Sequence, residues 1–144
     1  MKYLNLLNQY LANLAVWNVK LHNLHWNVIG KDFMPVHNFT EKLYDDVFTK
    51  FDDVAELIKI KGEMPLSTLS EYLKLASLKE IPGKDFNTSE VLEILKSDME
   101  LMKTLGVEIR NLADSEDDFA TVAMFEDHIG SFSKNLWFLN SMLK

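Results

Sequence analysis

Hydrophobic side chains recur every three or four residues along four long segments of the chain, which is the pattern of amphipathic helices. The pattern predicts long helices over about residues 3–28, 32–61, 88–113 and 118–142. The last of these carries Val122, Phe125, Ile129, Phe132, Leu136, Leu139 and Leu143, which alternate between steps of 3 and 4. Few segments alternate as a half-buried strand does, so the chain is predicted to be all-α.

Glycine and proline separate these segments. Gly30 lies in the first connection, and Gly62 and Pro65 follow the second helix. The sequence Thr68-Leu69-Ser70-Glu71 has the T-x-x-E form of a capping box and predicts a short helix over about residues 68–77. Pro82-Gly83 then breaks the chain before the third long helix.

The order of these elements predicts the fold class. Four long amphipathic helices, two short hairpin connections and one long crossover are typical of a four-helix bundle with ferritin-like connectivity. We therefore expect an all-α, ferritin-like bundle with a short extra helix in the crossover between the second and third long helices. No repeat or composition shift divides the chain, so residues 1–144 are expected to form one domain.

Composition excludes several kinds of site. The 144 residues include no cysteine, which excludes disulfides, thiolate-bound zinc, iron–sulfur clusters and cysteine nucleophiles. Any bound metal must therefore be held by oxygen and imidazole ligands. The net charge of -7 opposes general binding to nucleic acid, because such binding depends on Lys and Arg contacts with phosphate.

The sequence also bears on localisation. No apolar run approaches the roughly 20 residues of a membrane span. Amide side chains interrupt residues 1–10 too often for the apolar core of a signal peptide. We therefore expect a cytoplasmic protein without membrane association.

Polar residues that depart from the helical pattern cluster in the first two helices. His37 and Glu41 are four residues apart, as are Asp52 and Glu56, so each pair projects from one face of the second helix. His25 lies near the end of the first helix. Either pair alone is typical of a solvated helix face. Together, however, two imidazoles and three carboxylates suit ferrous iron, manganese or zinc better than calcium or magnesium.

The spacing prevents one chain from bringing these five groups together. Asp52 follows His37 by 15 residues, a separation of roughly 22 Å along a helix. In an antiparallel hairpin, His25 lies beside His37 and Glu41 and far from Asp52 and Glu56. Two copies packed antiparallel about a two-fold axis would join the histidine end of one to the carboxylate end of the other. We therefore expect two equivalent metal sites at a two-fold interface.

Several stretches of the sequence carry a resemblance to a known family. They are His22-Asn23-Leu24-His25-Trp26-Asn27-Val28-Ile29-Gly30-Lys31-Asp32-Phe33, Val36-His37 and Phe51-Asp52-Asp53-Val54-Ala55-Glu56. They resemble the signature of the Dps-type mini-ferritins (DNA-binding proteins from starved cells), with an H-W-N-x-x-G element and a second histidine 12 residues on. Residues 67–73 resemble the family's small crossover helix and residues 136–139 its closing helix, so the resemblance covers nearly the whole chain.

This resemblance implies a homododecameric shell that oxidises Fe(II), preferably with hydrogen peroxide, stores the ferric mineral and protects against oxidative stress. It implies inter-subunit ferroxidase sites with two irons each and no organic cofactor. The metal ligands would be His25, His37 and Glu41 from one subunit and Asp52 and Glu56 from its neighbour. The resemblance also implies a catalytic role for Trp26 as a local electron donor, with simple packing as the alternative.

The chain departs from the family pattern at two positions. Glu41 stands where the family usually has Asp, so this ligand reaches further, binds differently or acts through water. Leu57 stands where an Arg is common, which removes a cation that could orient the site. No Glu-x-x-His motif occurs, so a diiron site inside one bundle is not expected.

The family admits iron through acidic three-fold pores near the start of the last helix. Carboxylates in that region are Glu116, Asp117, Asp118, Glu126 and Asp127. We assign the pore to Glu126 and Asp127; a solvated face and a favourable interaction with the helix dipole are the alternative. His22 and His128 are expected to be structural or exposed.

The family's second activity is DNA protection. Direct DNA binding is not expected here, because the acidic sequence shows no Lys- or Arg-rich tail. The alternatives to iron storage are a DNA-compacting shell and a receptor-binding, neutrophil-activating shell, each with minor ferroxidase activity.

Overall fold

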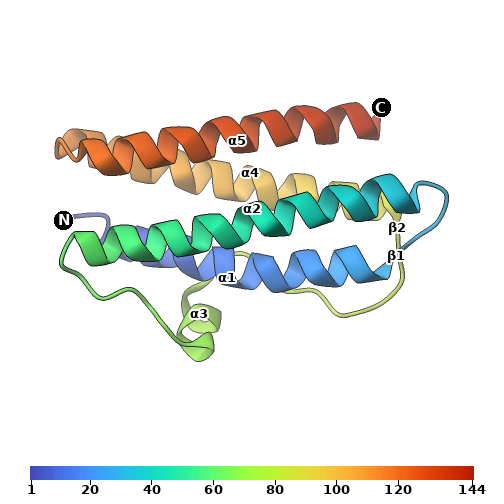
Figure 1. Ribbon diagram of the computed structural model, residues 1–144, viewed down its shortest axis with the longest axis horizontal. Coiled ribbons are helices and arrows are strands. Elements are labelled where there is room, and N and C mark those ends of the chain that lie inside the picture. The colour runs from blue at the N-terminus through green and yellow to red at the C-terminus, as the bar shows by residue number, and fades with distance from the viewer.

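The computed structural model describes residues 1–144 as a bundle of four long helices (Figure 1). They are α1 (Leu4–Asn27), α2 (Phe33–Ile60), α4 (Thr88–Ser115) and α5 (Phe119–Leu143). The pair α1 and α2 forms one antiparallel hairpin and α4 and α5 form another, and the crossover between them carries the short helix α3 (Leu69–Leu75). The all-α bundle and the extra crossover helix predicted from the sequence are confirmed.

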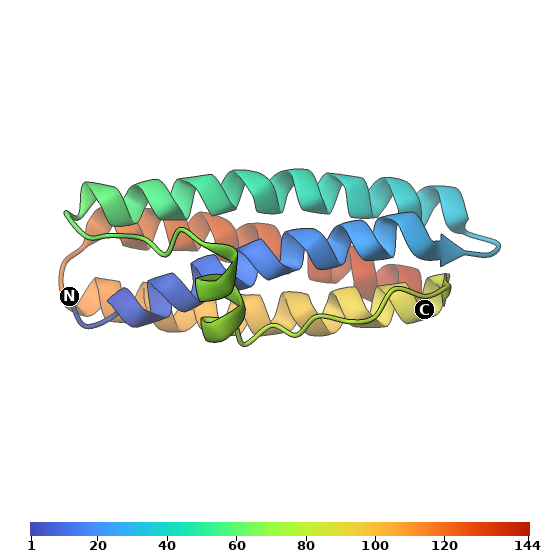
Figure 2. The ribbon, with the colours of Figure 1, turned by 90° about the horizontal axis from the view of Figure 1, so that it is seen from below.

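One small element was not predicted. Strands β1 (Val28–Ile29) and β2 (Phe86–Asn87) pair in parallel, with Val28 opposite Phe86. The pair lies at the end of the bundle where α1 stops and α4 is about to begin (Figure 2). Two residues are too few to show the period-two alternation by which a strand is recognised. The pairing ties the end of the crossover to the first hairpin.

The core lies between the four helices and contains 32 buried hydrophobic residues. Its largest fully buried side chains include Trp17, Tyr10, Phe125 and Phe132. Each helix contributes the stripe of three- and four-residue spacing seen in the sequence, because that spacing keeps side chains on one face. No helix combines the length and the hydropathy that a membrane span requires.

Amide side chains on α1 hold the crossover against the bundle. Asn8 accepts from the N–H of Leu66, Asn13 accepts from the N–H groups of Ser77 and Leu78, and Asn23 donates to the carbonyl of Ile81. Each bond pairs a side-chain amide with a backbone N–H or carbonyl that has no partner in regular secondary structure. These amides, which interrupt the apolar pattern of the first helix, therefore fix the path of the crossover.

Side-chain caps define where the later helices begin. The Thr68 hydroxyl accepts a hydrogen bond from the N–H of Glu71, which confirms the predicted capping box of α3. Asp118 caps α5 in the same way through the N–H of Thr121. Gly30, between α1 and α2, has φ of +112°, a conformation that an L side chain rarely adopts.

Candidate functional site

His25 and His37 meet where α1 ends and α2 begins. Their rings are stacked, with centroids 3.7 Å apart and planes inclined by 13°. Nδ1 of His25 lies 2.8 Å from the backbone carbonyl oxygen of His37, and Nδ1 of His37 lies 2.8 Å from the carbonyl oxygen of His25. The two residues therefore lock the hairpin together through reciprocal bonds.

These bonds determine which ring nitrogen is free to bind a metal. A carbonyl oxygen only accepts hydrogen bonds, so Nδ1 of each imidazole must carry the proton and donate. Nε2 of each neutral ring then keeps its lone pair, which is the form that ligates a metal. The hydroxyl of Thr40 lies 3.0 Å from Nδ1 of His25 and supports the same orientation.

Burial favours the neutral state of His25. Its side chain is 6% exposed, and burial lowers its pKa from the ordinary value against a smaller opposing effect of the hydrogen bond to His37. His37 is half-buried and stacks on Phe33, with ring centroids 4.9 Å apart. Both rings are therefore held by packing on one side and by backbone hydrogen bonds on the other.

Glu41 and Tyr44 continue this end of the site. Glu41 is exposed, one turn after His37, and its carboxylate accepts a long 3.5 Å hydrogen bond from the Tyr44 hydroxyl. Desolvation and the Glu41 carboxylate raise the pKa of Tyr44. The Tyr44 ring stacks on His22 at 3.9 Å and meets His25 edge-on at 5.2 Å. His22, whose Nδ1 bonds the carbonyl of Asn18, is thus a supporting residue.

Asp52 and Glu56 lie at the other end of α2 and are exposed. Asp52 follows His37 by 15 residues on the same helix, so the two residues are roughly 22 Å apart along the helix axis. Within the chain, no group of three or more His, Cys, Asp or Glu side chains is arranged to hold a metal ion. The structure therefore brings His25 and His37 together, with Glu41 one turn away, and leaves Asp52 and Glu56 apart from them.

A stripe on α2, exposed except at half-buried His37, connects the two groups. His37, Glu41, Phe48 and Asp52 follow one another at steps of 4, 7 and 4 residues, which keeps them on one helix face. Phe48, near the middle, is 63% exposed. A large apolar side chain between two polar groups on a solvent-facing stripe indicates a contact surface.

Comparisons with known proteins agree over the whole length of the chain. Residues 4–144 match the ferritin-like domain family. The DNA protection during starvation protein of Helicobacter pylori is 36% identical over 143 residues, which is 99% of each chain. This chain belongs to the Dps-type ferritin family.

Solved structures extend this Dps-type match to three dimensions. Helicobacter cinaedi CAIP superposes with a TM-score of 0.94 at 40% identity, covering 96% of this chain and 97% of that one. A Dps protein from Vibrio cholerae O1 has a TM-score of 0.94 at 32% identity, covering 99% and 89%. That protein is described as a member of a broad superfamily of ferritin-like diiron-carboxylate proteins. The ferritin-like connectivity predicted from the sequence is thereby confirmed.

The two positions that depart from the Dps pattern differ in their surroundings. Glu41 points from an exposed position, so its longer side chain has room to reach a metal. Leu57 is 4% exposed and belongs to the hydrophobic core, so it offers no partner to the neighbouring Glu56. Trp26 is 67% exposed beside His25, and its ring lies 5.5 Å from that of His22. Packing within the chain therefore does not account for Trp26.

The acidic residues near the start of α5 are not equivalent in this Dps-type chain. Asp118 accepts hydrogen bonds from Lys61, Tyr3 and Thr121. Burial raises the pKa of Asp118, but these donors together lower it to about 2. The Asp118 carboxylate is therefore engaged in hydrogen bonds that hold the fold. The sequence could not reveal this role, because Lys61 and Tyr3 lie far from Asp118 along the chain.

The two residues assigned to the pore are both exposed. Glu126 lies 3.3 Å from Nε of Arg110, which also pairs with Asp114. Asp127 follows it on α5. Sequence reasoning missed Arg110, because a cation on α4 and an anion on α5 become neighbours only when the hairpin closes.

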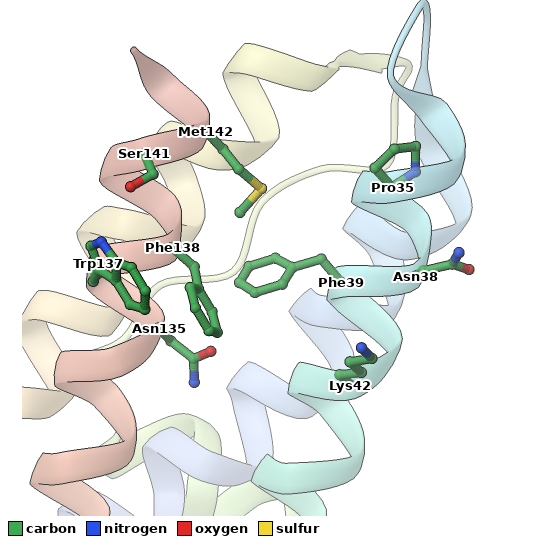
Figure 3. Close-up of a pocket in the computed structure, with 9 residues that line it drawn as sticks. All are labelled: Pro35, Asn38, Phe39, Lys42, Asn135, Trp137, Phe138, Ser141 and Met142. Atoms are coloured by element: carbon green, nitrogen blue, oxygen red, sulfur yellow. The ribbon is translucent and has the colours of Figure 1, made fainter.

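A separate apolar groove lies between the start of α2 and the end of α5. It encloses about 460 Å³ and is lined by Pro35, Asn38, Phe39, Lys42, Asn135, Trp137, Phe138, Ser141 and Met142. Figure 3 shows Phe39 and Phe138 pointing toward one another, with Met142 beside them and Asn38 pointing away. Trp137 is 64% exposed. The groove contains none of the candidate metal ligands.

Proposed function

We propose that this protein is a cytoplasmic ferroxidase and iron-storage shell. Fe(II) is oxidised at sites shared by two-fold related subunits, hydrogen peroxide is the preferred oxidant, and the ferric product is stored inside a dodecamer. The observation that carries the proposal is the division of α2 into two half-sites. His25 and His37 present free Nε2 atoms at one end, and exposed carboxylates stand roughly 22 Å away at the other.

The donor set suits iron as a substrate. Neutral imidazoles bind Fe(II), and carboxylates stabilise the ferric product through their charge. In the antiparallel dimer, His25, His37 and Glu41 of one subunit face Asp52 and Glu56 of the next, enough for two irons per site. Hydrogen peroxide takes one electron from each of two ferrous ions and, with two protons, leaves as two water molecules.

The exposed stripe supports the two-fold arrangement. Because Phe48 lies near the middle of α2, between the half-sites, a two-fold axis there would bring two Phe48 rings close together. Their burial would contribute a few kcal/mol, since a buried Phe side chain is worth about 1.5–3 kcal/mol. The same contact would bring Asp52 of each subunit toward His37 of the other.

Other exposed groups support the remaining parts of the proposal. Trp26, beside His25, is positioned to donate an electron to oxidising species formed at the site. The groove lined by Phe39, Trp137 and Phe138 supplies an apolar contact that the two-fold interface does not use, and a closed shell needs more than one kind of contact. Glu126 and Asp127 would attract Fe(II) to the pore.

Protection of DNA would follow from the same chemistry. The name of the Helicobacter pylori relative refers to DNA protection during starvation. This chain has a net charge of -7, which opposes direct contact with phosphates. We propose that it protects DNA indirectly, by consuming Fe(II) and peroxide together.

Subunit complementation tests the shared site. One chain carries His25→Ala and His37→Ala, and a second carries Asp52→Ala and Glu56→Ala. Neither shell alone should oxidise Fe(II) appreciably, whereas shells assembled from both chains should regain activity, because some interfaces then combine two intact halves. The matched control is a mixed shell in which both chains lack the histidines, which should stay inactive.

Anaerobic Fe(II) titration with size measurement completes this test. We expect saturation at two irons per interfacial site and a ferric core that grows faster with peroxide than with dioxygen. A protein that remains monomeric, or a shell that binds no iron at its interfaces, would refute the proposal. So would mixed shells of verified composition that recover no activity.

A further inference from the structure

A buried tyrosine–histidine pair lies in the bundle core and includes none of the candidate metal ligands. Tyr10 on α1 is fully buried and His128 on α5 is 3% exposed. The Tyr10 hydroxyl lies 2.9 Å from Nδ1 of His128. Neither residue has a part in the proposed function, and polar groups are seldom placed in a core without a reason.

The direction of this hydrogen bond follows from what surrounds it. His128 is the sole hydrogen-bond partner of the Tyr10 hydroxyl in the structure, and a buried phenol is strongly favoured to donate. The phenol therefore donates to Nδ1, and the imidazole proton sits on Nε2. His128 is thus arranged as a base toward Tyr10.

Charges from α2 support this arrangement. The ammonium of Lys50, a residue 4% exposed, pairs with the carboxylate of Asp46, whose side chain is 43% exposed at the edge of the core. The pKa of His128 is lowered to about 4, mainly by burial and next by the Lys50 charge, while the Asp46 charge opposes this shift. Burial and the Asp46 charge raise the pKa of Tyr10 well above its ordinary value. At neutral pH the pair is therefore a protonated phenol and a neutral imidazole.

Such a pair is equipped for one specific reaction. A phenol that loses one electron becomes strongly acidic, and a base already at hydrogen-bond distance takes its proton without rearrangement. We propose that Tyr10 and His128 form a proton-coupled one-electron donor that reduces stray oxidants produced by iron and peroxide. This role rests on the proposed function for its source of oxidants.

The position of the pair connects it to the interface. Asp46 and Lys50, which face the pair, precede Asp52 on α2, whose carboxylate points to the outside. In the antiparallel hairpin His25 lies opposite His37 and Asn18 opposite Tyr44, so Tyr10 lies at the level of Asp52 along α2. On the other side, the ring of Phe132 lies 6.4 Å from His128 and 6.0 Å from fully buried Trp17. Oxidisable and aromatic rings thus continue from the pair through the core.

The electrons and protons balance in two steps. A hydroxyl radical, formed when one Fe(II) reduces peroxide by a single electron, takes an electron from Tyr10 and a proton from solvent and becomes water. The phenolic proton moves to Nδ1 of His128, which leaves a neutral phenoxyl beside an imidazolium. A second Fe(II) then supplies an electron to the phenoxyl and becomes Fe(III), and the proton returns from His128 to Tyr10.

Freeze-quench electron paramagnetic resonance tests the pair in the iron-loaded shell. After peroxide addition we expect a tyrosyl radical in the wild type that is mostly lost in Tyr10→Phe. Tyr72→Phe is the matched control, because the buried Tyr72 hydroxyl donates to the backbone carbonyl of Leu66, which cannot take a proton. In His128→Asn, which lacks the base, less phenoxyl should form, and its g-tensor at high field should be altered.

A second arm separates this inference from the proposed function. Iron-free shells are oxidised with a photogenerated ruthenium(III) complex, which needs no metal site, and the same variants are compared. A Tyr10-dependent radical supports the inference even if the shell fails to oxidise Fe(II), a failure that would refute only the proposed function. Equal radical signals in the wild type and in folded Tyr10→Phe, in both arms, would overturn the inference.

Discussion

The imidazoles of His25 and His37 stack at 3.7 Å, and each donates from Nδ1 to the backbone carbonyl of the other. This reciprocal pair joins the last turn of α1 to the first turns of α2. Because both Nδ1 atoms are used in these bonds, both Nε2 atoms remain free, and these are the atoms that the proposed site uses as metal ligands. One structural feature therefore closes the hairpin and prepares the proposed ligands.

Thr40→Val tests whether orientation of His25 matters for iron binding. The substitution keeps the shape of the side chain but removes the hydroxyl 3.0 Å from Nδ1 of His25. We expect Fe(II) affinity to fall about 10-fold, the lower end of the usual effect of losing a group that orients a ligand. Anaerobic isothermal titration measures it. Thr49→Val, at an exposed position on the same helix, is the control, and equal affinities in all three proteins would contradict the prediction.

Asn13→Ala tests the amide clamp on the crossover. The fully buried Asn13 side chain accepts hydrogen bonds from the N–H groups of Ser77 and Leu78. Its removal leaves these two N–H donors without an acceptor, so the free energy of unfolding should fall by about 2–4 kcal/mol. Urea denaturation measures the loss, and amide exchange should quicken at Ser77 and Leu78.

The control for the clamp is Gln9→Ala. Gln9 makes one long bond of 3.3 Å to the carbonyl of Leu75, so its removal should cost less than about 1 kcal/mol. Equal losses in the two variants would show that the Asn13 bonds do not hold the crossover.

Helix positions and the separation of His37 from Asp52 could be predicted because both depend on local periodicity. A rise of 1.5 Å per residue was enough to show that His37 and Asp52 cannot share a metal in one chain. Contacts between distant segments could not be predicted. Tyr10 and His128 are 118 positions apart and carry no shared motif, and the pairing of Val28 with Phe86 involves strands too short for a pattern.

The pore assignment shows the same limit. A cluster of acidic residues near the start of α5 was visible in the sequence, but which of them are free depends on neighbours from other helices. Lys61 comes from the end of α2 and Arg110 from α4. Only the folded arrangement shows that Asp118 is bound by Lys61 and that Glu126 is paired with Arg110.

Asp118 should give the protein a distinct acid sensitivity. Its folded-state pKa of about 2 lies below the ordinary value of 3.8, so the stabilisation is complete above pH 3.8 and is lost as the pH falls toward 2. The difference corresponds to about 2 kcal/mol. Asp118→Asn keeps a cap for α5 but loses this charge, so its unfolding free energy should fall less steeply over that window.

Denaturation at a series of pH values measures this difference. Asp127→Asn, at an exposed position, is the control and should keep the wild-type slope. Parallel slopes for the wild type and Asp118→Asn would mean that the bonds from Lys61 and Tyr3 do not depend on the Asp118 charge.

Trp137→Glu tests the groove as a shell contact distinct from the two-fold interface. Burying a glutamate carboxylate against Phe39 and Phe138 without a partner would be costly, so contacts through the groove should fail. The α2 stripe is unchanged, so assembly should stop at dimers that still bind Fe(II) but store no mineral. Sedimentation velocity distinguishes dimers from shells, and Trp137→Phe should assemble normally. Intact shells of Trp137→Glu would exclude the groove from assembly, whereas monomers without iron sites would tie the groove to the two-fold contact.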